Sequence, residues 1–184
     1  MKPINNYENV QASTGEFARP SAGGYICKII DVTDVDHNPN TGNGQYLKIE
    51  YDIADGDFKG YFKEQFDKWG GDWKANFVRS YKEKNLGMLK HFTNCIEQSN
   101  AGYEWDWNEK GLIGKIVGLV LGEEEYQNNA GEIKTKLVVK NIATVEDIKN
   151  GNFKVPAPKK LAVTGRTNEF TEFAPIENDD TLPF

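Results

Sequence analysis

The sequence is poor in the residue types that most often carry catalysis and metal binding. Its 184 residues include 2 cysteines and 2 histidines. Cys27 and Cys95 lie far apart, one in a strand-like run and one in a helix-like run, which predicts reduced, buried thiols rather than a disulfide or a four-ligand zinc site. His37 and His91 have no evident partner set with a serine or cysteine nucleophile. We therefore expect no catalytic residues, no metal and no other cofactor.

Long apolar runs are also missing. The longest, "LIGKIVGLVL", contains a lysine and is far shorter than the roughly 20 residues that a membrane helix needs. The first residues, "MKPINNYENVQ", contain no apolar signal-peptide core. These absences predict a cytoplasmic protein without membrane contact.

Negative charge is abundant but unevenly distributed. The net charge is −6. From Arg166 onward the sequence contains one basic residue, Arg166 itself, and five acidic ones: Glu169, Glu172, Glu177, Asp179 and Asp180. That segment carries −4, so residues 1–165 carry the remaining −2. A nearly neutral body does not exclude a polyanionic partner.

Alternating apolar residues, a continuous apolar run typical of a buried strand at residues 112–122, and turn signals predict five strands. They lie at residues 25–32, 46–53, 58–65, 112–122 and 131–142. Asp55-Gly56 predicts a tight hairpin between the second and third strands. A helix follows within residues 80–100, starting at the Ser80/Glu83 capping box or near Asn85. Residues 144–149 are predicted to form one helical turn.

This order predicts an all-β fold with one helix. A helix between the third and fourth of five strands is the layout of the OB-fold, a Greek-key barrel; the strand count also fits other small barrels or an α+β sheet. We assign residues 1–22 to a lead-in, 23–155 to the OB-fold domain and 156–184 to a flexible acidic tail.

One face of the predicted 46–65 hairpin combines lysines with tyrosines. Its register places Lys48 opposite Lys63, and like charges opposed in a ladder are destabilising unless an anion binds between them. Single-stranded nucleic acid is such an anion, since its bases also stack on aromatic rings. In the alternative interpretation the face is solvated and Glu50 and Asp52 offset the lysines. The candidate residues on this face are Tyr46, Lys48, Lys59, Tyr61 and Lys63.

Two further groups extend the candidate surface. Lys134 and Lys136 lie on one face of the last predicted strand. Trp69 and Trp73 stand in a glycine-rich loop and are candidates for base stacking, although we expect one of them to fill the end of the barrel.

An enzymatic alternative comes from the acidic residues near the last hairpin. Two carboxylates and a lysine beside a sheet can hold Mg²⁺ and activate water, as in metal-dependent nucleases or resolvases. The residues that would form this cluster are Glu123, Glu124, Glu125, Glu132 and Lys134.

The segments "LGMLKHFTNCIEQSN", "GKIVGLVLGEEEY" and "IKNGNFKVPAPKK" resemble OB-fold single-stranded DNA-binding proteins of phages and mobile elements. The end of the chain, "DDTLPF", resembles the acidic tip of bacterial single-stranded DNA-binding proteins. Thr181 and the body of the sequence depart from the bacterial pattern, so a tetramer is not carried over and homo-oligomerisation stays open.

The resemblance implies a protein that coats single-stranded DNA in a bacterial host cell during phage or element replication and recombination. Its tip would recruit partner enzymes through Asp179, Asp180, Leu182, Pro183 and Phe184. A third hypothesis is a recruitment adaptor that does not touch DNA.

Overall fold

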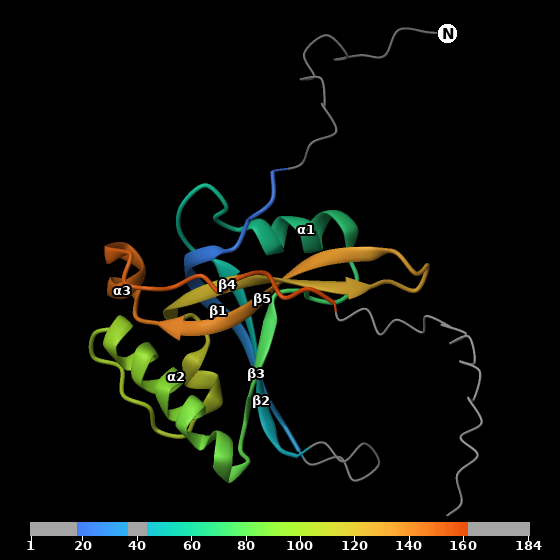
Figure 1. Cartoon of the computed structure of the whole chain (residues 1–184). Helices are drawn as coiled ribbons and strands as arrows, with labels where there is room; N and C mark the ends of the chain where they lie inside the picture. Colours follow the sequence, from blue (N-terminus) through green and yellow to red (C-terminus); the bar gives the residue numbers. More distant parts are fainter. Residues whose placement is uncertain (1–17, 37–43, 162–184) are drawn as a thin grey trace, which may run out of the picture.

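A five-stranded antiparallel sheet forms the centre of the structure (Figure 1). The structure is a computed structural model that describes residues 18–36 and 44–161. In it the strands are ordered β3-β2-β1-β4-β5 and the sheet is open, with β3 and β5 as its edges. The strands are β1 (Gly23–Val35), β2 (Tyr46–Ile53), β3 (Asn76–Ser80), β4 (Ile116–Gln127) and β5 (Ile133–Ala143).

Four of the predicted strands are confirmed. β1, β2, β4 and β5 occupy the segments that the pattern of apolar residues indicated, and β4 pairs with β5 as predicted for the last hairpin. The third strand is different, because β3 begins at Asn76 rather than near residue 58. The fold is therefore mostly β, but three α-helices rather than one lie among the described residues.

The predicted 46–65 hairpin is wrong. Residues Tyr61–Trp69 form helix α1, so Lys63 lies on a helix, and Lys48 lies opposite Thr33 on β1 and Val78 on β3. Phe62, Phe66 and Trp69 follow the i, i+4, i+7 spacing of a helix, and the turn at Asp55-Gly56 opens into a longer connection.

Asp52 explains why a helix forms there. Its buried carboxylate accepts hydrogen bonds from the backbone N–H groups of Phe62 and Lys63 at 3.0 and 3.2 Å. These N–H groups belong to the first turn of α1, where a helix has no internal acceptors. Gly60 precedes the helix with φ 77°, a value that glycine adopts without steric cost. A β2 side chain therefore fixes the start of α1.

Helix α2 (Leu86–Ser99) confirms the helix predicted between the third and fourth strands. Of the two predicted starting points the one near Asn85 is correct, since the preceding residues Glu83–Asn85 form the short 3₁₀ helix η2. Of the four apolar residues at helical spacing, Leu89, Phe92 and Ile96 are buried, whereas Leu86 at the start of the helix is exposed. The other short helix, α3 (Val145–Asn150), is the single turn expected at residues 144–149 and carries a Thr144/Asp147 capping box.

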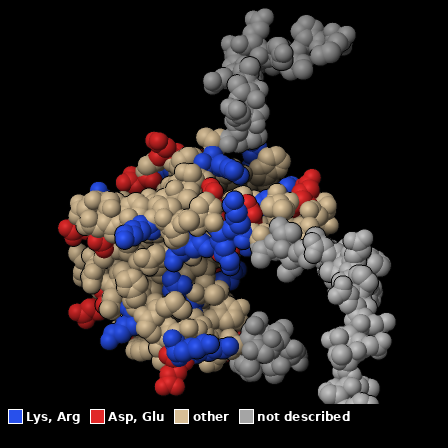
Figure 2. Space-filling view, viewed as in Figure 1, with Lys and Arg blue, Asp and Glu red and all other residues tan. Residues whose placement is uncertain are grey.

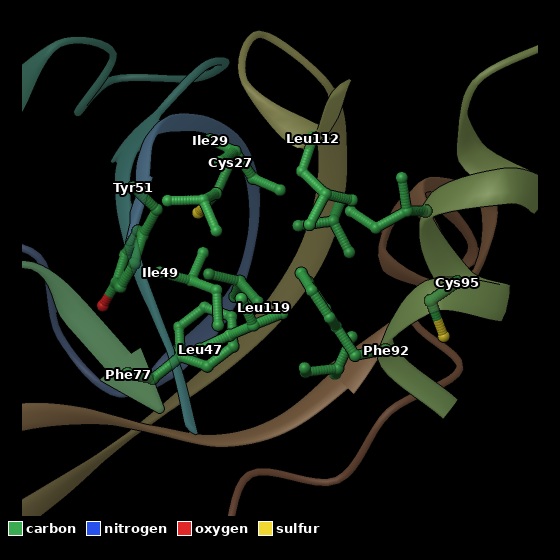
Figure 3. Packing of buried hydrophobic residues seen from close by; sticks show 14 of the residues in the cluster. Cys27, Ile29, Leu47, Ile49, Tyr51, Phe77, Phe92, Cys95, Leu112 and Leu119 are labelled. Atoms are coloured by element: carbon green, nitrogen blue, oxygen red, sulfur yellow. The ribbon is translucent and has the colours of Figure 1, made fainter. Parts of the chain in front are cut away.

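The core lies between the sheet and α2 (Figure 3). Phe92 of α2 meets Phe77 of β3 edge to face, with ring centroids 5.6 Å apart. Leu47, Ile49 and Leu119 point into the same space from β2 and β4. Burying each such side chain stabilises the fold by roughly 1.5–3 kcal/mol, so this cluster holds α2 and the sheet together.

The chain that leaves α3 returns to the sheet. Because β1 begins at Gly23 opposite Leu121, β4 has an unpaired edge beyond that point. Lys159 fills part of this edge in parallel orientation, donating its N–H to the Glu123 carbonyl and accepting from the Glu125 N–H, each at 2.9 Å. This pairing fixes the position of the lysine-containing segment against the β4–β5 hairpin.

The helices of the described chain are also informative about membranes. Among residues 18–36 and 44–161, none of the helices is both long and apolar enough to cross a bilayer.

Candidate nucleic-acid interface

A groove of about 570 Å³ runs between the start of α1 and the β4–β5 hairpin. We call it the basic groove. Three cationic side chains and two tyrosines line it, together with a single carboxylate. These residues are Arg19, Lys74, Lys136, Tyr61, Tyr126 and Glu123. Thus five separate segments of the chain contribute these side chains, and the combination of cations and aromatic rings suits a polyanion with flat groups that can stack.

The tyrosines of the basic groove are held in different ways. Tyr61 is half-buried on α1 and meets Phe58 and Phe62 edge to face, with ring centroids 6.1 and 5.3 Å away. Tyr126 on β4 is 37% exposed, and the Lys136 ammonium lies 5.8 Å from its ring centre. One ring is fixed by packing, and the other is partly open beside a cation.

Positive charge continues from the groove along β5. Glu124 lies across the ladder from Lys136 and bonds to the Lys140 ammonium at 2.5 Å. That hydrogen bond, followed by the charges of Lys140, Lys159 and Lys136, lowers the pKa of the Glu124 carboxyl. Three lysines thus surround one carboxylate, and we call Lys136, Lys140 and Lys159 the lysine cluster. Figure 2 shows lysine and arginine side chains gathered in a band over the middle of this face.

Two of the predicted site residues come together in the basic groove. These are Tyr61 and Lys136. Lys134 is close by on β5, opposite Tyr126, and forms an ion pair with Glu132 at 3.1 Å. The last hairpin therefore contributes more to this site than its predicted partner hairpin does.

Other predicted residues lie elsewhere. Tyr46 and Lys48 are half-exposed on β2, where the Lys48 ammonium pairs with Glu50 at 2.7 Å. That hydrogen bond raises the pKa of Lys48. Lys59 is exposed in the turn before α1, and Lys63 pairs with Asp67 at 2.6 Å on the helix surface. The neutralisation of Lys48 by Glu50 agrees with the solvated-face alternative at this position.

The two tryptophans near α1 differ, as expected. Trp73 is half-buried, donates its indole N–H to the Tyr51 carbonyl at 3.0 Å and contacts Phe66. Trp69, at the end of α1, is 69% exposed, and the Lys68 ammonium lies 5.2 Å from its ring. Trp69 is thus the one of the pair that is available for stacking.

Sequence reasoning missed Arg19, Lys74 and Tyr126. Arg19 was assigned to the lead-in, and Lys74 lay in a loop whose path the sequence did not indicate. Tyr126 had a usable signal, because the predicted last hairpin already places it near Lys134 and Lys136.

The acidic residues of the nuclease hypothesis are dispersed. Glu124 is paired with Lys140, whereas Glu132 is exposed at the hairpin turn and bonds to Asn128 and Lys134. In the part of the chain that the structure describes, no three histidine, cysteine, aspartate or glutamate side chains converge to hold a metal ion.

The tip residues Asp179, Asp180, Leu182, Pro183 and Phe184 lie outside the described residues. No protein-family model matches the sequence, and no curated protein matches it significantly.

Proposed function

We propose that the protein binds single-stranded DNA in the basic groove and on the lysine cluster, largely without sequence preference. The observation that carries this proposal is the convergence of Arg19, Lys74 and Lys136 on Tyr61 and Tyr126. Phosphates would be held by the cations and released counterions would favour binding, while bases would stack on the rings.

An OB-type barrel is the architecture that fits this proposal. Its support is the pairing of β1 with both β2 and β4, the placement of α2 between β3 and β4, and the contact between the edge strands β3 and β5. Small barrels of this type bind oligonucleotides on an outer face. The loop between strands 4 and 5 belongs to the binding region of such barrels, and the β4–β5 hairpin contributes Tyr126 and Lys136 to the basic groove.

The biological setting remains a proposal from the sequence alone. The quoted motifs support a role in phage or mobile-element replication and recombination in the bacterial cytoplasm. The acidic tip supports recruitment of partner enzymes. In this proposal the protein handles DNA and catalyses no reaction.

The test is a titration of the full chain with oligo(dT) at two salt concentrations, in which tryptophan fluorescence reports binding. We expect tight binding that weakens with salt. Lys136→Ala should weaken binding and reduce the slope of log affinity against log salt by about 0.7, the value for one phosphate contact on a single strand. Tyr126→Ala should weaken binding by roughly 1–3 kcal/mol while leaving that slope unchanged.

Lys149→Ala is the matched control, because Lys149 is an exposed lysine on α3, away from the groove lining. It should bind like the unmodified chain. Absence of binding at low salt would refute the proposed function. Equal losses of oligo(dT) affinity in Lys136→Ala and Lys149→Ala would show that the basic groove is not the binding site.

A further inference from the structure

The outer face of α2 carries a second hollow, of about 470 Å³, between this helix and the loop that follows it. Leu86, Lys90, Asn94 and Glu97 line it from the helix, and Trp107 lines it from the loop. Leu86 is 44% exposed and Trp107 is 80% exposed. An indole this exposed beside an exposed leucine is typical of an interaction surface.

The backbone at Trp107 holds the ring in this exposed position at an energetic cost. Trp107 has φ 65°, and no other non-glycine residue among those described has a positive φ. Such a conformation is unfavourable for a bulky residue and persists where the surroundings impose it. Its neighbour Trp105 is anchored by the Glu97 carboxylate, which accepts the Trp105 backbone N–H at 2.8 Å.

The charges of this surface do not suit a nucleic acid. Glu97 lines the main hollow, and Asp34 and Glu109 line a smaller hollow of about 260 Å³ that shares Leu86 and Trp107. Carboxylates at these positions would repel phosphates. The face therefore favours a protein occupant.

One helix face here is complementary to itself. Lys90 and Glu97 are seven residues apart, so they lie two turns apart on the same face, at a spacing of about 10.5 Å. If two α2 helices pair antiparallel about a two-fold axis near Asn94, Lys90 of each copy meets Glu97 of the other. Among the described residues Lys90 has no acidic partner within its own chain.

We propose that this face binds a second copy of the chain, with two symmetric Lys90–Glu97 ion pairs flanking Asn94 and with Leu86 and Trp107 covered at the seam. The pairing is antiparallel and isologous. Because it is built on α2, it leaves the lining of the basic groove of each copy open.

Charge reversal tests the pairing in the full chain. Dimerisation is measured by sedimentation velocity over a range of concentrations. Lys90→Glu places a second carboxylate opposite Glu97 of the other copy and should raise the dimer dissociation constant about tenfold or more. Lys149→Glu, the same change on an exposed lysine of α3, should leave that constant unchanged.

Mixing two variants tests the orientation. A Lys90→Glu chain mixed with a Glu97→Lys chain should form heterodimers, because each contact then joins opposite charges. Glu97→Lys removes the acceptor of the Trp105 N–H, so a cross-link provides a second route that spares this bond. Asn94→Cys should form an intermolecular disulfide under mild oxidation, whereas Lys149→Cys should not.

Three results would overturn the proposal. A chain that stays monomeric at the highest concentration it tolerates would leave the face to a different protein partner. A dimer that Lys90→Glu does not weaken, or that Asn94→Cys does not cross-link, would place self-association on another surface. The proposed function and the proposed dimer are tested separately, because Tyr126→Ala should weaken oligo(dT) binding and leave the dimer intact.

Discussion

Asp52 is expected to decide whether α1 forms, and removing its carboxylate tests this directly. The side chain is 6% exposed and accepts from the N–H groups of Ile53, Phe62 and Lys63 at 2.8, 3.0 and 3.2 Å. Two of these bonds join β2 to the first turn of α1. Asp52→Ala leaves both helix donors without a partner in a partly buried region.

The magnitude follows from these two donors. Each partly buried donor left unsatisfied costs about 1 kcal/mol or more, and the loss of a helix cap costs roughly 0.5–2 kcal/mol in proteins. These overlapping effects give a predicted loss of about 2–3 kcal/mol in the free energy of unfolding for Asp52→Ala. Asp52→Asn keeps one oxygen acceptor and loses the charge, so about 1 kcal/mol is expected.

Urea unfolding measured by far-ultraviolet circular dichroism is the assay, with the slope m compared between variants to check that the unfolded state is unchanged. Asp57→Ala is the matched control, because Asp57 is an exposed aspartate in the same connection. If Asp52→Ala and Asp57→Ala lower the stability equally, the carboxylate does not cap α1 and our account of the failed hairpin prediction is incorrect.

Three further outcomes are expected. Glu124 has a pKa below its ordinary value, so its contribution to stability is present at neutral pH and is lost as pH falls below about 4.3 and through the lowered value. Glu124→Gln should therefore flatten the plot of urea midpoint against pH in this acidic range. An unchanged plot would contradict the lysine cluster. Thr144→Ala removes the capping box of α3 and should cost about 1 kcal/mol in urea unfolding, whereas a cost near zero would show that α3 is held by packing alone. Burial raises the pKa of the Cys27 and Cys95 thiols, so neither should react with a thiol reagent until the protein is unfolded in urea; rapid labelling of the native chain would disagree.

How much of the fold the sequence determines depends on where each element finds its partners. β1, β5 and α2 were predictable because their apolar spacing matches a single period, and β4 because it is a short continuous apolar run bounded by turn residues. Leu89, Phe92 and Ile96 illustrate this, since helical spacing alone places them on the buried face of α2.

The segment 58–69 was mispredicted because its local signals conflict. Asp55-Gly56 favours a tight hairpin, whereas Phe62, Phe66 and Trp69 also suit a helix. The decision came from Asp52, which lies on β2 and accepts hydrogen bonds from α1 residues that follow it by 10 and 11 positions in the chain. A contact of this kind leaves no periodic trace in the sequence.

The candidate site shows the same division. The lysines of β5 were visible in the sequence, because strand alternation places Lys134 and Lys136 on one face. Only the tertiary structure showed that Lys136 meets Arg19 and Lys74, since these two residues come from a lead-in and a loop. The sequence by itself determined the local periods and the charge of each segment, whereas only long-range packing determined which charges and rings share a groove.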